Sequence, residues 1–310
     1  MKKFGDRYQS LFKVTLLVFN FFICVAFFEK FFGNVQFFVQ LKTILVPNGW
    51  WGEIGLGRGI SLLSTEPSRA AIEVAIVYSL LWFYYKRYRA YLTLTFIALE
   101  LLLIKSMTGA IFCMIAILAA YPVMFLSMSF IVMYYFLNIH DNQIFEIRWL
   151  AIVKDVLDAS NWEAVLDIFL ALSGNRIISL VASVKTILTY PLGLGIGGST
   201  IAADQIYEMI DLREKINVFQ HKNFNGDYNL KSSSFFSSLL MEVGILSLTF
   251  LFVYIRFIIK SLNNARNGIV LPISVITFSL LFIGPAGSPI PFACLGLLVL
   301  HNRAEGGATK

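Results

Sequence analysis

The sequence predicts an all-α, polytopic integral membrane protein. Of its 310 residues, 57% are hydrophobic and only 14% are charged, which leaves too little polar side chain to cover a water-soluble chain of this length. The apolar runs recur along most of the chain, so a cleaved signal peptide or a single anchor does not explain them. The formal charge of +6 does not indicate nucleic-acid binding, because the basic residues flank the apolar runs as topology signals do.

Spanning helices are expected where apolar runs approach roughly 16 to 25 residues, because a helix satisfies its own backbone polar groups in lipid. This criterion predicts about eight spans. Most of them are single runs: Leu11–Phe28, Ala70–Tyr85, Tyr91–Ile104, Phe235–Ile259, Ile269–Ile283 and Ile290–Leu300. The run Met107–Leu137 is too long for one span and carries Tyr121-Pro122 near its middle, which predicts two helices joined by a tight turn.

Basic residues assign the sides of the membrane. They lie before the first run, after the second and after the sixth: Lys2, Lys3, Arg7 and Lys13; Lys86, Arg87 and Arg89; Arg256, Lys260 and Arg266. Because positive charge is retained in the cytoplasm, both termini are predicted to lie inside. The chain is interpreted as one membrane domain, residues 1–310, with outer loops at residues 30–68 and 139–234.

The long extracytoplasmic loop, residues 139–234, is predicted to contain its own helices, because a structureless segment of roughly 95 residues is unusual in a compact protein. Ser160 and Glu163 have the spacing of a capping box before an apolar-rich stretch. A second stretch, Arg176–Thr189, ends at Tyr190-Pro191. Acidic residues interrupt the first stretch, so these helices are expected on or near the membrane surface.

The first outer loop contains a charged trio. Glu66, Arg69 and Glu73 follow the spacing i, i+3 and i+7, and they share one face if the helix begins early enough. Charges at a membrane entry are costly unless they are paired or line a wet cavity. Two interpretations remain open: a self-satisfied ion-pair network at the lipid boundary, and a substrate-facing site.

The outer loops also carry cations suited to phosphate. Arginine binds phosphate through two parallel hydrogen bonds and lysine acts as a point charge, so Arg58, Arg176 and Lys231 could converge on a pyrophosphate. The glycine-rich residues 191–198 lack the strand–turn–helix context of a dinucleotide site; they are expected to let the backbone approach a ligand or another helix. His221 lies in the outer loop without the spacing of a metal site.

Two carboxylates lie inside predicted spans. Glu242 is placed about two turns below the serines Ser233 and Ser234, and Glu100 lies in the third span. Intramembrane acids are functional candidates, although a protonated acid bonded to a neighbouring helix is an alternative. Cysteines occur singly, so neither a disulfide framework nor a metal or cofactor site is predicted: Cys24, Cys113 and Cys294.

The order of several motifs resembles the O-antigen polymerase and ligase superfamily, which contains Wzy-type polysaccharide polymerases and O-antigen ligases. The matching stretches are Gly57-Arg58 with Thr65-Glu66-Pro67-Ser68; Ser106-Met107-Thr108-Gly109; Gly174-Asn175-Arg176 with Tyr190-Pro191-Leu192-Gly193-Leu194-Gly195; and Ser233-Ser234-Phe235 with Glu242-Val243-Gly244. The ligase branch has His-Asn where this chain has Ser233-Ser234, which argues against a ligase. One predicted helix precedes the first motif, whereas the family usually has several.

The resemblance implies a GT-C-like membrane glycosyltransferase that joins undecaprenyl-pyrophosphate-linked oligosaccharide repeats at the outer face of the bacterial cytoplasmic membrane. Arg58 and Arg176 would neutralise the leaving diphosphate, and Glu66 would accept the proton of the attacking hydroxyl. Lys231 would join the diphosphate cradle. Further substrate contacts are expected from Arg69, Ser233, Ser234, Glu242 and His221.

The implied partners are the lipid-linked oligosaccharide, membrane lipid and a chain-length regulator protein, and the product would be O-antigen, capsule or exopolysaccharide. The main alternatives are an O-antigen ligase acting on the lipid A core and a transporter or flippase of lipid-linked sugars. A transporter predicts internal repeats and interrupted helices, and no repeat is found between the two halves. A structural membrane subunit is the remaining alternative.

Overall fold

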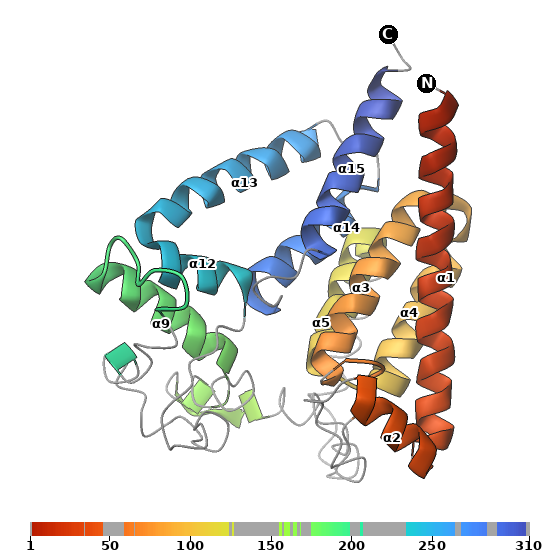
Figure 1. Cartoon of the computed structure of the whole chain (residues 1–310), viewed down its shortest axis with the longest axis horizontal. Coiled ribbons are helices and arrows are strands. Elements are labelled where there is room, and N and C mark those ends of the chain that lie inside the picture. The colour runs from red at the N-terminus through yellow and green to blue at the C-terminus, as the bar shows by residue number, and fades with distance from the viewer. Residues whose placement is uncertain are drawn as a thin grey trace. The chain divides into compact units, whose positions relative to one another are not determined.

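The computed structural model describes residues 2–33, 35–45, 59–64, 66–123, 126, 155–156, 158–161, 164–165, 168, 175–198, 205–206, 234–263, 268–283 and 290–307. The chain forms two compact units (Figure 1). Unit 1 comprises residues 1–129, 261–277 and 289–310, and unit 2 comprises residues 130–260 and 278–288. Throughout the described residues the regular structure is helical, as the composition predicted.

Unit 1 contains the N-terminal helices and the last ones. Its elements are α1 (Lys2–Phe32), α2 (Gln36–Leu45), α3 (Pro67–Tyr84), the short turn η1 (Lys86–Tyr88), α4 (Arg89–Ala98), the π-helical η2 (Leu99–Ile104), α5 (Met107–Ala120), most of α14 (Val270–Phe278) and α15 (Ile290–Gly307). Most helices lie where apolar runs predicted them. The helix α2 was not predicted, because its run is too short to suggest a span.

Helices α1 and α3 run antiparallel. The ring of Phe12 stacks on that of Tyr84 with centroids 3.9 Å apart, and at the other end the Ser61 N–H donates to Glu29 Oε1 over 3.1 Å. The start of α1 therefore lies beside the end of α3. Figure 1 shows both chain ends at the same end of unit 1, where α3 leads into α4.

Helix α3 forms the centre of unit 1. It contacts α1, α4, η2 and α5, and small residues such as Ala70, Ala71 and Ala75 on it are fully buried, which allows close helix packing. Tyr78 stacks on Phe96 of α4 with ring centroids 4.2 Å apart. These contacts position the beginning of α3, where the charged trio lies.

The break at Tyr121-Pro122 is confirmed for the first of the two predicted helices. Helix α5 ends at Ala120, and the Tyr121 N–H donates to the carbonyl of Ile117 over 2.7 Å. Proline cannot continue the helical hydrogen-bond pattern. Most of the second predicted helix lies outside the described residues.

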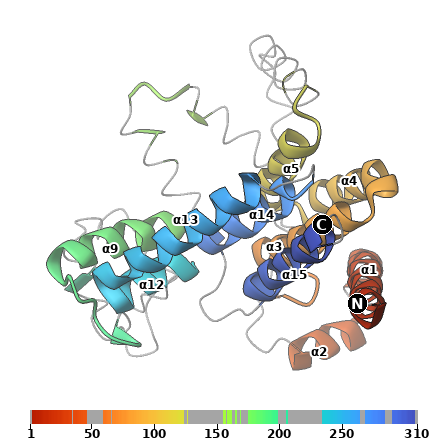
Figure 2. The same ribbon diagram turned by 90° about the horizontal axis from the view of Figure 1, so that it is seen from above.

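Unit 2 contains α9 (Asn175–Thr189), α12 (Phe235–Val243), the short turn η5 (Gly244–Leu246), α13 (Ser247–Asn263) and the π-helical η6 (Ser279–Ile283). The predicted continuous span Phe235–Ile259 is wrong in one respect, because the helix is interrupted at Gly244, whose φ is 65° and ψ is −140°. Figure 2 shows α9 and α12 side by side, and these two helices are in contact. The segment 235–261 remains helical on both sides of the interruption.

Among the residues that the structure describes, two helices are long and apolar enough to cross a membrane, Ser10–Phe32 and Phe235–Ser261. Shorter apolar helices lie at Thr108–Ala120, Ser179–Thr189, Val270–Leu281 and Ile290–Val299.

The capping-box prediction is shifted by one residue, because Asn161 Oδ1 accepts the Ala164 N–H over 2.8 Å. Asparagine caps helices as well as serine does, so Ser160 precedes the cap.

Candidate functional site

The beginning of α3 carries the first candidate residues. Glu66 is the N-cap residue, with extended backbone angles of −152° and 155°, and Pro67 occupies the first turn. The Glu66 side chain does not cap the helix. Instead its Oε1 lies 3.8 Å from Arg69 Nε, with 47% of the Glu66 side chain and 40% of the Arg69 side chain exposed. This ion pair is therefore accessible from outside the protein.

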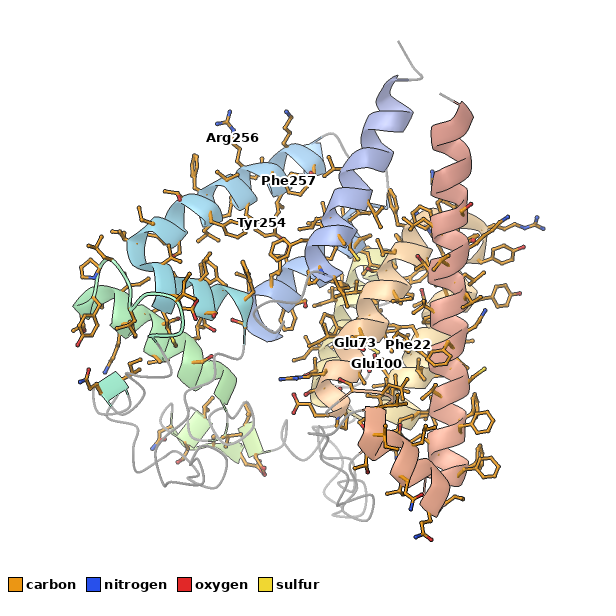
Figure 3. The ribbon with its side chains drawn as sticks, in the orientation of Figure 1. Phe22, Glu73, Glu100, Tyr254, Arg256 and Phe257 are labelled. Carbon is orange, nitrogen blue, oxygen red and sulfur yellow. The ribbon has the colours of Figure 1, made fainter. Side chains whose placement is uncertain are left out.

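The charged trio shares one side of α3, as its spacing predicted. Arg69 acts electrostatically on Glu73 as well as pairing with Glu66. Glu73 is half-buried one turn further into the helix. Figure 3 shows Glu73 and Glu100 at a similar level of unit 1. One arginine thus links an exposed carboxylate with a more deeply placed one.

The first outer loop rests on the end of η2. The Ile60 N–H donates to the Leu103 carbonyl over 3.0 Å, and Gly59 lies directly against the Ile104 carbonyl, where a Cβ atom would collide with it. Lys105 ends η2 in the left-handed conformation, with φ of 50°. Gly59 and Ile60, which follow Arg58 in the sequence, are therefore held against the end of η2.

Glu100 is fully buried beside the start of α5. Its carboxyl group lies against Gly109, where an added Cβ atom would be 3.0 Å from Glu100 Cδ and closer still to Oε2. Ser106 caps α5 by accepting the Gly109 N–H over 2.8 Å. Neither Glu100 oxygen has a hydrogen-bond partner within the part of the chain that the structure describes.

The first cluster is defined here as Glu29, residues 59–61, Glu66, Arg69, Glu73, Glu100, Ser106 and Gly109. Glu29 was not among the predicted site residues, although an acid at the end of the first apolar run was a usable signal. It is buried, and it binds the Ser61 N–H. Residues that lie between the two parts of the outer-loop motif are thus bonded to η2 through Ile60 and to α1 through Ser61.

The second cluster comprises residues 190–198 and 241–245, which interlock through their backbones. The Leu194 N–H donates to the Met241 carbonyl over 2.9 Å, and the Gly195 N–H donates to the Glu242 carbonyl over 3.0 Å. In the opposite direction the Ile245 N–H donates to the Pro191 carbonyl over 2.7 Å. The motif stretches that contain residues 190–195 and 242–244 are therefore joined.

Glycine makes this close approach possible. Gly193 has φ of 82° and Gly244 has φ of 65°, a region that side chains disfavour. A Cβ atom on Gly193 would lie 2.6 Å from the Gly244 nitrogen, and one on Gly244 would lie 2.6 Å from the Leu192 carbonyl carbon. The expectation that these glycines admit a neighbouring backbone is confirmed, and that backbone belongs to an interrupted helix.

Glu242 and Ser234 have different surroundings. Glu242 is half-buried, and its Oε1 accepts the Gly197 N–H at a long distance of 3.4 Å. Ser234 is buried and caps α12, since its Oγ accepts the Ser237 N–H over 3.1 Å and lies 2.9 Å from Ser237 Oγ. The hydroxyl of Ser234 thus builds the helix start, whereas the Glu242 carboxylate is more accessible.

The remaining predicted site residues lie outside what the structure describes: Arg58, His221, Lys231 and Ser233. Arg176 occupies the first turn of α9, and its side chain is also outside the described atoms. The convergence of Arg58, Arg176 and Lys231 stays a prediction. Among the described residues no group of three or more His, Cys, Asp or Glu side chains could hold a metal ion.

Comparisons of the chain with models of known protein families, with curated proteins and with solved structures find no match. The residues of this chain that bear on function are the exposed Glu66–Arg69 pair and the first and second clusters.

Proposed function

We propose that the protein is a multi-pass membrane glycosyltransferase that polymerises polysaccharide repeats carried on undecaprenyl pyrophosphate, at the outer face of the bacterial cytoplasmic membrane. One observation carries the proposal. Two motif stretches that are far apart in the sequence, and whose order resembles that of polysaccharide polymerases, are in contact: the Gly195 N–H of residues 190–195 donates to the Glu242 carbonyl of residues 242–244. Chance matches to short motifs would not be expected to pair in this way.

A membrane location is supported by exposed apolar surface on the long helices. In the most apolar 18-residue window of Ser10–Phe32 only 17% of the residues are buried, and in that of Phe235–Ser261 33%. The core helix of a soluble protein would be mostly buried. On α1 the exposed residues are Leu11, Val14, Leu17, Phe21, Phe27, Phe28, Phe31 and Phe32. Hydrocarbon is the environment that stabilises such a surface.

The proposed reaction needs a base and a cationic cradle. A hydroxyl oxygen of the incoming repeat attacks the anomeric carbon of the growing glycan, and the bond from that carbon to the diphosphate oxygen breaks. The hydroxyl proton passes to the Glu66 carboxylate, while the leaving diphosphate takes the bonding electron pair. Arg58, Arg176 and Lys231 neutralise its charge. Arg69, 3.8 Å from Glu66, orients the base.

The exposure of the Glu66–Arg69 pair favours a substrate-facing role over a self-satisfied network. Exposed ion pairs contribute little to stability, about 0 to 1 kcal/mol. Because the Glu66 side chain does not cap α3, replacing it should leave the helix start intact. Glu66→Gln is therefore a suitable test of function that does not unfold the protein.

The test is complementation of a polymerase-deleted host of the same glycan type, with polymer length read on a gel. The chain, Glu66→Gln and Arg176→Ala are compared at matched membrane abundance. Arg87→Ala is the matched control, because Arg87 is an exposed cation at the opposite end of α3. We expect a ladder from the parent and from Arg87→Ala, and a single repeat from the other two.

A parent that reaches the membrane intact and gives no ladder would contradict the proposal in that host. Full ladders from both Glu66→Gln and Arg176→Ala would contradict the assigned residues while leaving the activity in place.

The second candidate is a transporter or flippase of lipid-linked sugars, and the interruption at Gly244 favours it. Discontinuous helices often form substrate sites in transporters. The same assay separates the two functions. A flippase would restore glycan in a flippase-deleted host and give no ladder in the polymerase-deleted one.

A further inference from the structure

Helix α9 has a polarity opposite to that of a helix on a water-soluble surface. The side packed into unit 2 carries small and hydroxyl-bearing residues that are at most 1% exposed: Ser179, Ala182, Ser183 and Thr186. Their hydroxyls bond within the protein, as Thr186 does to the Ala182 carbonyl over 2.7 Å. The outward side carries Val184 and Leu188, which are 51% and 77% exposed. In water the apolar residues would be expected inside.

The apolar surface continues from α9 into the glycine-rich loop. Leu192 is 78% exposed and Ile196 is 97% exposed, so apolar side chains project at every fourth residue from Val184 onwards. Ile245 and Leu246, on the facing turn η5, are also about half exposed. Exposed apolar side chains on neighbouring segments of this kind mark a membrane or a partner. The lipid-facing stripe is defined here as Val184, Leu188, Leu192 and Ile196.

Backbone hydrogen bonds place the loop part of the lipid-facing stripe beside the residues that precede α13. The Ile245 N–H donates to the Pro191 carbonyl over 2.7 Å, so Leu192 lies beside the residues that lead into α13. Helix α13 itself exposes a run of apolar residues: Leu248, Phe252, Val253, Ile255 and Ile259. The loop end of the stripe therefore lies beside η5, which leads directly into α13.

The candidate membrane span is longer than α13 and includes η5. It runs from Phe235 to Ser261, and its exposed cations, Arg256 and Lys260, lie towards its C-terminal end, as expected near an interface. Hydrocarbon around this span therefore surrounds η5 and the loop that is hydrogen-bonded to it.

We infer that the lipid-facing stripe is buried among the acyl chains of the outer leaflet. On this inference α9 and residues 190–198 form a membrane-embedded element rather than a water-exposed part of the external loop. It rests on the proposed membrane location, and it is independent of the polymerase reaction. The occupant is bilayer lipid, because the loop that carries Leu192 and Ile196 is hydrogen-bonded to residues 241–245 of the candidate span Phe235–Ser261.

The inference can be tested by spin labelling of the full chain in phospholipid vesicles. Single cysteines replace Leu188 and Ile196 in a background that lacks the native cysteines, and collision rates with oxygen and with a water-soluble nickel chelate are measured. Both side chains project outward, so the labels should not disturb packing. Phe252→Cys, on the exposed side of α13, is the lipid control, and Asp158→Cys, exposed in the long loop, is the aqueous control.

We expect the labels at Leu188 and Ile196 to collide mainly with oxygen, as the label at Phe252 does, while the label at Asp158 collides mainly with nickel. If Phe252 is lipid-exposed and the two stripe labels are nickel-accessible, the inference is wrong and the membrane location stands. If the stripe labels are shielded from both reagents, protein covers the stripe, and the lipid assignment is overturned. Nickel access at Phe252 as well would overturn the membrane location and this inference together.

Discussion

Replacing Gly109 by alanine should destabilise unit 1 through a collision with the buried carboxyl group of Glu100. The new Cβ atom would lie 3.0 Å from Glu100 Cδ, 3.1 Å from Ser106 Oγ and closer still to Glu100 Oε2. Because Glu100 is fully buried, its carboxyl group cannot move into solvent. Overpacking of this kind costs about 1 to 3 kcal/mol, against at most about 1 kcal/mol gained by replacing a helical glycine with alanine.

The effect should disappear or reverse in sign when the carboxyl group is absent. In a Glu100→Ala background the collision with the carboxyl group is gone and only Ser106 Oγ, 3.1 Å from the added Cβ, remains close, so Gly109→Ala should change the free energy of unfolding by between zero and a gain of about 1 kcal/mol. The four proteins of this cycle are compared by the free energy of unfolding in detergent, and the coupling between the two sites is expected at about 1 to 3 kcal/mol. Gly296→Ala is the control, because no atom lies within 4 Å of its added Cβ.

An equal effect of Gly109→Ala in both backgrounds would refute this argument, because the Glu100 carboxyl group would then not lie against α5. A loss of stability in Gly296→Ala equal to that in Gly109→Ala would also refute it, since the added methyl group alone would then be responsible.

Five further substitutions test individual glycines and one helix cap. Gly244→Ala should lower the free energy of unfolding by about 3 kcal/mol or more, because its positive φ and the opposing loop both exclude a side chain. Gly195→Ala has open space around the added Cβ atom and should lower the free energy of unfolding by only about 1 to 2 kcal/mol. Denaturant titration of both variants measures the difference. Asn161→Ala should cost about 1 kcal/mol by removing a helix cap, and Ser160→Ala should leave the same titration unchanged. Gly59→Ala, whose Cβ would collide with a backbone carbonyl, should prevent accumulation in the membrane, measured by immunoblot.

Local features of the sequence predicted most helices correctly. An apolar run bounded by polar residues or proline is visible without knowledge of the fold, and this signal located α3, the end of α5 at Tyr121 and the helix that ends at Thr189. The proximity of Glu66 to Arg69 was expected from their spacing, because residues three apart at a helix start approach each other; the exposure of the pair was left open by the sequence.

Features that depend on distant segments were not predictable in this way. The interruption at Gly244 lies inside a continuous apolar run, and it is stabilised by a hydrogen bond between the Ile245 N–H and the Pro191 carbonyl. Likewise nothing near Glu100 in the sequence indicates that its carboxyl group lies against Gly109. Each of these depends on the approach of two backbones that only the fold brings together.

The clusters separate residues that build the scaffold from residues that are available for chemistry. Gly193 and Gly244 admit opposing backbones, and the Ser234 hydroxyl is occupied in capping α12. Glu66 and Arg69, in contrast, are about half exposed at the beginning of a helix. Replacing a scaffold residue such as Gly244 should lower both the protein's abundance and glycan polymerisation. Replacing Glu66 or Arg69 should lower polymerisation while the protein's abundance stays unchanged. The protein's abundance and glycan polymerisation are therefore measured for Gly244→Ala and Glu66→Gln. If both variants lowered the two quantities alike, this division of the motif residues would be wrong.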